Sequence, residues 1–84
     1  WFAVIMEIPK SKLQLCGDDA VIVINLKCDP LLIGSLLSEK GIHKGYHMNK
    51  NHWITVRLDG GVDDEKIKWL LDLSFDLTVK KGRK

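Results

Sequence analysis

The chain is short and mildly basic. It has 84 residues, of which 45% are hydrophobic, and a formal net charge of +2. This length fits one compact domain over residues 1–84 with a small core, because a second core needs a longer chain. No apolar run approaches the roughly 20 residues that a helix needs to cross a bilayer, which excludes a helical membrane protein.

The cysteines and the first residues bear on the cellular compartment. Cys16 and Cys28 are too few for a disulfide scaffold, and each lies beside or within an apolar run where a reduced thiol packs well. We therefore expect a reducing, cytoplasmic setting. The start at Trp1 lacks the charged region and the cleavage site of a signal peptide. Because the chain opens without Met inside an apolar strand pattern, we expect that a preceding segment has been removed.

The first third of the chain predicts strands. Residues 1–8 are almost all apolar and rich in β-branched and aromatic side chains, which favours a strand buried on both faces. Turn formers in residues 9–19 surround Leu13 and Leu15, which could form a brief strand. Residues 20–27 alternate between two faces and predict a strand, with Asn25 and Lys27 at a solvated end.

A helix is predicted next. Asp29 can accept hydrogen bonds from the first free N–H groups, and Pro30 is tolerated at the first helical position. Lys40-Gly41 provides a stop signal. The residues with helical spacing, which we expect to face the core, are Leu31, Leu32, Leu36 and Leu37.

A second strand and helix pair follows. Residues 53–58 alternate, with Trp53, Thr55 and Arg57 on the polar side, which predicts a half-exposed strand. An acidic run at residues 63–65 then favours the start of a helix, and residues 80–84 form a basic tail that we expect to fray. The predicted core stripe of this helix comprises Ile67, Leu70, Leu71 and Phe75, widened by Trp69, Leu73 and Leu77. The class is therefore α+β, a small antiparallel sheet packed against helices, with a strand order that the sequence does not predict.

Charge is segregated along the chain. Residues 40–58 contain four cations and no Asp or Glu, whereas residues 59–76 hold two lysines against six acids. Such segregation creates a local positive potential, which favours an anionic partner. The prediction requires the cations to form one contiguous exterior patch.

Three motifs give the sequence a specific resemblance. They are Asn25-Leu26-Lys27-Cys28-Asp29-Pro30, then Gly45-Tyr46-His47-Met48-Asn49-Lys50 running into His52-Trp53 and Thr55-Val56, and Ser74-Phe75-Asp76-Leu77. Together they resemble the MmcQ/YjbR family. The resemblance implies a small α+β domain similar to the double-wing DNA-binding domain of a phage transcription factor, with a further N-terminal helical segment in most members.

Charge and resemblance together predict a non-enzymatic protein that binds nucleic acid, which we expect to be DNA, through residues 40–58. Lysine and arginine can neutralise phosphates, polar side chains can position the backbone, and aromatic rings can stack on bases or sugars. The predicted phosphate contacts are Lys40, Lys44, Lys50 and Arg57. The predicted positioning residues are His47, Asn49, Asn51 and His52, and the predicted stacking residues are Tyr46 and Trp53.

Other interpretations stay open at this stage. The segment could be a purely structural loop whose aromatic side chains fill the core. It could instead form a pocket at Tyr46, His47 and Trp53 for a small anionic or aromatic ligand or a protein. A third alternative is an oligomerisation or partner-docking domain that uses the strand at Trp1.

Metal, cofactor and catalytic sites are not predicted. The spacing of His43, His47 and His52 matches no common zinc motif, so we expect hydrogen-bonding histidines and no metal. No serine lies in a nucleophile elbow, and Gly60-Gly61 lacks a phosphate-binding pattern. We expect no catalytic residue and no cofactor.

Overall fold

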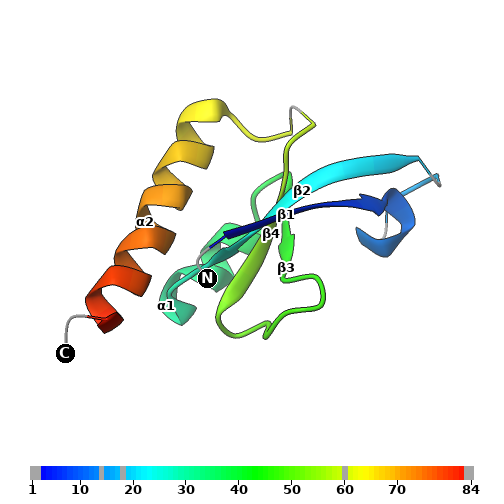
Figure 1. Cartoon of the computed structure of the whole chain (residues 1–84). Coiled ribbons are helices and arrows are strands. Elements are labelled where there is room, and N and C mark those ends of the chain that lie inside the picture. The colour runs from blue at the N-terminus through cyan, green and yellow to red at the C-terminus, as the bar shows by residue number, and fades with distance from the viewer. Residues whose placement is uncertain (1–2, 14, 18, 60, 83–84) are drawn as a thin grey trace.

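The computed structural model describes residues 3–13, 15–17, 19–59 and 61–82, with side chains through residue 79. Within these ranges a four-stranded antiparallel sheet of order β1-β2-β4-β3 packs against two helices, so the predicted α+β class is confirmed (Figure 1). The elements are β1 (Ala3–Pro9), the short 3-10 helix η1 (Lys10–Leu13), β2 (Ala20–Lys27), α1 (Pro30–Leu37), β3 (Ile42–Lys44), β4 (Trp53–Arg57) and α2 (Asp64–Gly82). No described helix is long and apolar enough to cross a membrane.

The sheet has two covered faces, which we call the helix face and the cleft face. On the helix face, α1 and α2 pack against the central strands; its buried side chains include Ile24, Leu26, Ile33, Leu36, Ile42, Ile54, Val56 and Leu70. On the cleft face, η1 and the segment after β3 cover a smaller cluster of Ile8, Leu13, Val21 and Val23, with Met6, Leu15 and Tyr46 partly buried against it. Burial on both faces explains why β2 is apolar on both sides.

The β1–β2 hairpin differs from its prediction. Residues Ala3 to Pro9 pair with Leu26 to Ala20, which leaves β1 at one edge of the sheet. Ile5 is 66% exposed, so burial of this strand on both faces was wrong, because no described element covers its helix-face side at that point. The predicted brief strand at Leu13 is instead η1, whose Leu13 side chain is buried in the cleft-face cluster.

Helix α1 begins as predicted and ends earlier. The Asp29 carboxylate accepts a hydrogen bond from the Leu31 N–H at 2.9 Å, and Pro30 occupies the first turn. The helix ends at Leu37, and Gly41 then turns the chain into β3 with φ of +86°. A Cβ at Gly41 would lie 2.5 Å from Val62 Cγ2, so this turn requires glycine.

The buried stripe of α1 is narrower than predicted. Ile33 and Leu36 are buried, but Leu31 is 88% exposed and Leu32 is 37% exposed. The helix is eight residues long and contacts the sheet with one side only, so the first-turn leucines point away from the core.

The α2 stripe is rotated relative to its prediction. Leu70 and Ser74 are buried and Ile67 is partly buried, whereas Trp69 and Phe75 are 46% and 50% exposed. Positions 67, 70 and 74 have helical spacing, and position 75 lies about 100° further round the helix, on its outer side. The helix includes residues 80–82 of the predicted tail, and residues 83–84 lie outside the described part.

The two cysteines occupy different environments. Cys16 is exposed, so its predicted packing into an apolar run was wrong. Cys28 is buried, and burial, followed by the nearby Asp29 carboxylate, raises the pKa of its thiol. The predicted packing of the Cys28 thiol into an apolar run is confirmed by this burial.

Candidate nucleic-acid interface

Strand β4 is buried on both faces, contrary to its prediction as half exposed. Trp53 is 9% exposed and Thr55 is fully buried, although both lie on the polar side of the alternating pattern. The cover comes from residues 45–52, the β3–β4 loop, which begins where β3 ends and packs Tyr46 onto the cleft face. The cleft-face side of β4 is therefore buried by this loop.

A polar row crosses the cleft face from β2 to β3. Asn25 pairs with Thr55, and Thr55 pairs with His43, in adjacent strands. Asn25 is fully buried, so the prediction that it is solvated was wrong. The Thr55 hydroxyl donates to the Asn25 side-chain oxygen and accepts from the Tyr46 N–H at 2.8 Å. The Asn25 amide donates to the Tyr46 carbonyl at 3.0 Å, so the row holds the loop at both backbone groups of Tyr46.

The loop is further shaped by its own backbone. Gly45 is buried, and a Cβ there would lie 2.9 Å from the Trp53 Cβ and 3.0 Å from its carbonyl oxygen. His47 adopts φ of +58°, in the left-handed region where histidine is tolerated. The Asn49 side chain accepts from the Asn51 N–H at 2.8 Å, which forms an Asx turn. These contacts fix the course of the loop without using its one lysine, Lys50.

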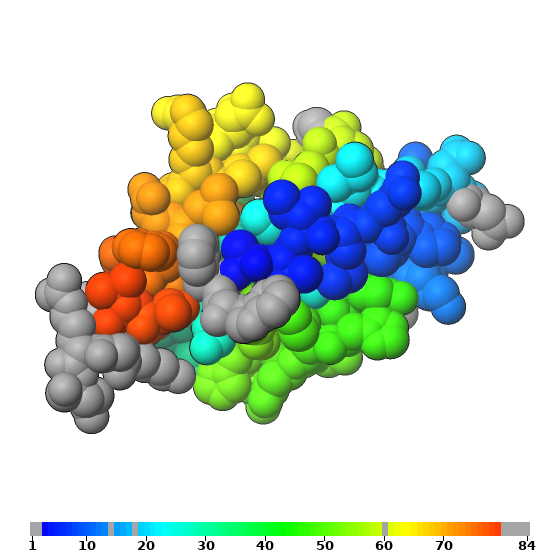
Figure 2. Space-filling view, in the orientation of Figure 1, coloured from blue at the N-terminus to red at the C-terminus, as the bar shows by residue number. Residues whose placement is uncertain are grey.

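A cleft of about 570 Å³ lies beside β3, and we call it the β3 cleft. Its wall combines side chains from η1, α1, β3 and the β3–β4 loop: the cations Lys12, Lys44 and Lys50, the imidazoles of His43 and His47, Tyr46, Gly45, and the apolar Leu13, Leu37 and Ile42. Among the described residues, no Asp or Glu lines it. In Figure 2 the green segment containing β3 and the loop lies against the blue segment of β1 and η1.

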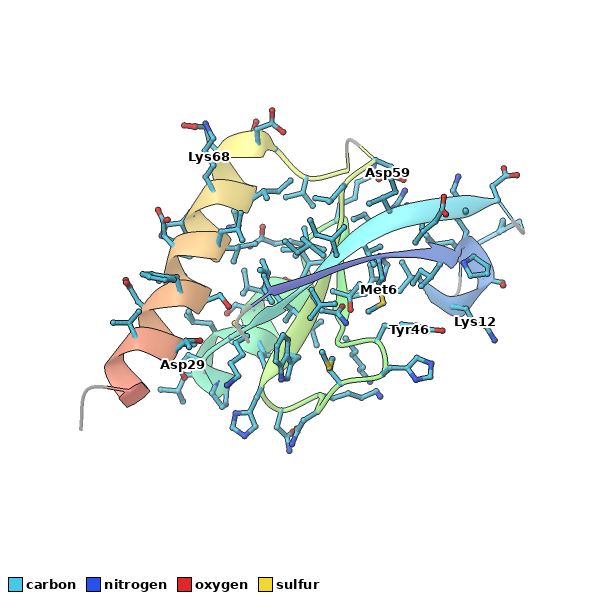
Figure 3. The ribbon with its side chains drawn as sticks, in the orientation of Figure 1. Met6, Lys12, Asp29, Tyr46, Asp59 and Lys68 are labelled. Atoms are coloured by element: carbon cyan, nitrogen blue, oxygen red, sulfur yellow. The ribbon has the colours of Figure 1, made fainter. Side chains whose placement is uncertain are left out.

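Tyr46 connects the two sides of this cleft. Figure 3 shows its side chain directed toward the end of the molecule that carries Lys12. Its ring is partly buried against the cluster that contains Leu13, and the His47 ring lies edge-on at a centroid distance of 4.2 Å. Tyr46 therefore packs in the wall and also contributes to the lining.

His43 lines the cleft and carries one unsatisfied polar atom. Its Nε2 is buried and has no hydrogen-bond partner among the described residues. Burial lowers the pKa of His43, the nearby Arg57 charge lowers it further, and Asp59 opposes both effects. The lowered pKa favours the neutral form of the imidazole, whose ring lines the cleft while its Nε2 stays buried.

The structure brings four of the ten predicted site residues to this cleft, namely Lys44, Tyr46, His47 and Lys50. Asn49, Asn51 and His52 are exposed on the same loop but do not line the cleft. Lys40 is exposed in the turn before β3, also outside the lining. The predicted cationic patch is therefore only partly contiguous.

Two predicted contacts have other roles. The Arg57 guanidinium forms a salt bridge with Asp59 at 2.6 Å, so its charge is locally compensated. The Trp53 ring is buried, with Lys27 Nζ 6.0 Å from its centroid, and it packs in the fold instead of offering a face for stacking. The prediction of Trp53 as an exposed stacking residue was wrong because the loop covers this side of β4.

Lys12 and His43 line the cleft but were not among the predicted site residues. Lys12 lies far from the cationic segment along the chain, and only the β1–β2 hairpin brings η1 to the cleft. A basic pair at Lys10 and Lys12 was the only local signal. His43 was expected to be a hydrogen-bonding histidine, whereas its Nε2 has no partner among the described residues. Within the described ranges, no three His, Cys, Asp or Glu side chains gather as a metal site.

Comparison with known proteins identifies the family of this chain. The family model described as YjbR matches residues 1–77. The chain belongs to the YjbR family. The uncharacterized protein YyaQ of Bacillus subtilis is 37% identical over 78 residues, covering 93% of this chain and 66% of YyaQ. The uncharacterized protein YjbR of Escherichia coli K12 is 37% identical over 57 residues, covering 67% of this chain and 48% of that protein.

Solved structures agree with the YjbR-family assignment. A crystal structure of a protein from Pseudomonas syringae has a TM-score of 0.90 and 49% sequence identity, covering 93% of this chain and 67% of that chain. The family resemblance and the α+β fold predicted from the motifs are thus confirmed. The chain spans between about half and two thirds of the length of the curated relatives described above.

Proposed function

We propose that this YjbR-family domain is a non-enzymatic nucleic-acid-binding protein that holds a DNA backbone at the β3 cleft. One observation carries the proposal: separate elements supply Lys12, Lys44 and Lys50 to one cleft whose described lining contains no acid. All three lysines are exposed, and within the described part of the chain none of them forms a salt bridge that a phosphate would have to break. Lysine at the rim of a cleft suits phosphate because it acts as a flexible point charge.

The electrostatic contribution has a measurable size. Binding to duplex DNA releases counterions, and the logarithm of affinity falls with the logarithm of salt concentration by about 0.9 per neutralised phosphate. Three lysines therefore predict a slope magnitude near roughly 2.7, if each neutralises one phosphate. Titration of a labelled duplex by fluorescence anisotropy at several salt concentrations measures this slope.

Two lysine variants test whether DNA contacts the β3 cleft or the cationic segment at residues 40–58 that the sequence predicts. Lys12→Ala removes a cation that lines the cleft but lies outside residues 40–58, whereas Lys40→Ala removes one inside that segment but outside the cleft. The proposal predicts that Lys12→Ala reduces the slope by about 0.9 and that Lys40→Ala changes it little. Lys68→Ala, an exposed substitution on α2, controls for the change in net charge. Absence of binding at low salt would refute the proposal.

A small-ligand module is the second candidate, and the apolar part of the cleft favours it. A volume of about 570 Å³ lies within the range of ligand pockets, and Leu13, Leu37 and Ile42 line it beside the cations. An anionic aromatic compound would use both parts. A thermal-shift screen with nucleotides and small aromatic acids tests this candidate, because a specific ligand raises the melting temperature. A compound that stabilises the protein in the absence of any DNA binding would favour this candidate.

A further inference from the structure

The β3 cleft is polar at its rim and less polar inside. Lys12, Lys44 and Lys50 are exposed, whereas Leu13 and Ile42 are 8% and 3% exposed. The His43 imidazole belongs to the same lining, with its Nε2 buried. A ligand that matches the cationic rim and the less polar interior carries negative charge at one end and a flat, weakly polar group at the other.

We infer that the β3 cleft accepts one unpaired nucleotide of a single strand, with its phosphates at the lysine rim and its base inside beside His43. This inference rests on the proposed function and specifies the form of nucleic acid that binds. Phosphate alone leaves the apolar wall and the His43 ring without a role. A nucleobase matches both, since its faces pack on apolar groups and its edges carry hydrogen-bond donors and acceptors.

The shape of the site also favours an unpaired strand. Bases in a duplex are stacked, and a concave pocket reaches one only after the base has been unpaired and unstacked, which lowers the affinity. A single strand avoids most of that cost. Neutral His43 is suited to the contact because one of its two ring nitrogens donates a hydrogen bond and the other accepts one. Tyr46, in the adjacent wall, offers an aromatic surface to the base.

The test compares three labelled ligands with the wild-type protein: a mixed-sequence single strand, the same sequence as a duplex, and a strand of equal length with abasic sites. The abasic strand keeps the phosphates and removes the bases. We expect the intact single strand to bind at least about tenfold more tightly than either of the others, because only it supplies a base without unpairing. If the duplex or the abasic strand binds as tightly as the intact strand, the inference is wrong and the proposed function stands. If none binds at low salt, both are wrong.

Substitution at His43 tests the assigned contact. His43→Ala is expected to weaken single-strand binding about tenfold while leaving abasic-strand binding within twofold, since only the base contact is lost. His43→Gln, which keeps a donor and an acceptor, should restore part of the affinity. Lys44→Ala is the matched contrast, because loss of a rim cation should weaken the intact and abasic strands equally. Equal weakening of both strands by His43→Ala would overturn the contact, and thermal melting verifies that each variant is folded.

Discussion

The two faces of the sheet are stabilised by different chemistry. The helix face buries aliphatic side chains from five elements, with Leu26 and Ile54 fully inaccessible to solvent. The cleft face buries the Asn25 and Thr55 side chains in a hydrogen-bonded row and leaves a cleft beside it. Apolar packing thus explains the fold, whereas the polar row explains the position of one loop. The candidate site lies beside edge strand β3, where its lining combines Leu13 and Tyr46 of the cleft face with Leu37 and Ile42 of the helix face.

The largest expected effect is a cavity on the helix face. Leu26→Ala should lower the free energy of unfolding by about 2–5 kcal/mol, because a fully buried side chain at the centre of the sheet is lost. Urea denaturation followed by tryptophan fluorescence measures the change. DNA affinity, expressed per folded molecule, should stay near the wild-type value. A variant that retains wild-type stability would contradict the importance assigned to this face.

A smaller loss is expected from the polar row of the cleft face. Thr55→Val keeps the side-chain shape but leaves the Asn25 oxygen and the Tyr46 N–H without their partner, which costs about 1–3 kcal/mol. DNA binding should also weaken, because the β3–β4 loop loses one of its attachments. Thr78→Val is the matched control, since its hydroxyl makes one 3.3 Å bond to the preceding helical turn. If Thr55→Val and Thr78→Val change the free energy of unfolding and the DNA affinity equally, the polar row does not position the loop.

His43 is expected to make stability depend on pH. Its folded pKa lies below the unfolded value of 6.5, so the unfolded state binds more protons between these two values. The free energy of unfolding should therefore fall as the pH is lowered from about 6.5 to the folded pKa. The variant His43→Gln, compared with the wild type by urea denaturation at several pH values, should show a flatter dependence. An identical dependence in both proteins would assign the effect to other groups.

The smallest effect is expected at the Arg57–Asp59 salt bridge. The Arg57 hydrogen bond lowers the pKa of Asp59, so its contribution is present above the unfolded value near 3.8 and is lost as pH falls through the folded pKa. Asp59→Asn should cost about 1 kcal/mol or less at neutral pH, because both side chains are partly exposed. The same variant frees the Arg57 charge, so the salt dependence of DNA binding should become slightly steeper. A loss of several kcal/mol would mean that the pair stabilises the fold far more than its exposure indicates.

Local patterns predicted most elements, because their signals depend on neighbouring residues. The alternation in residues 20–27, the cap at Asp29 and the acidic start of α2 all have this local character. Burial was predicted less well. Ile5 and Phe75 are apolar but partly exposed, and Thr55 is polar but buried, since each outcome depends on which distant segment covers the position.

The candidate site was predicted in part for the same reason. Lys44, Tyr46, His47 and Lys50 are close in sequence, so one segment predicted them together. Lys12 comes from the far end of a hairpin and could be placed only by the pairing of β1 with β2. The salt bridge of Arg57 with Asp59 was within reach of sequence reasoning, because the two residues are separated by one position at the end of a strand.

The lining of the β3 cleft comes from opposite edges of the sheet. Lys12 lies in η1, which follows edge strand β1, and Lys44 lies in β3 at the other edge. A ligand that touches both would cross-link the two margins and oppose any separation of the hairpin from the remaining strands. Amide hydrogen exchange in β1 should then slow upon ligand binding, even at amides that the ligand does not touch. Slower amide exchange in β1 would thus indicate a ligand in the β3 cleft, although no residue of β1 lines that cleft.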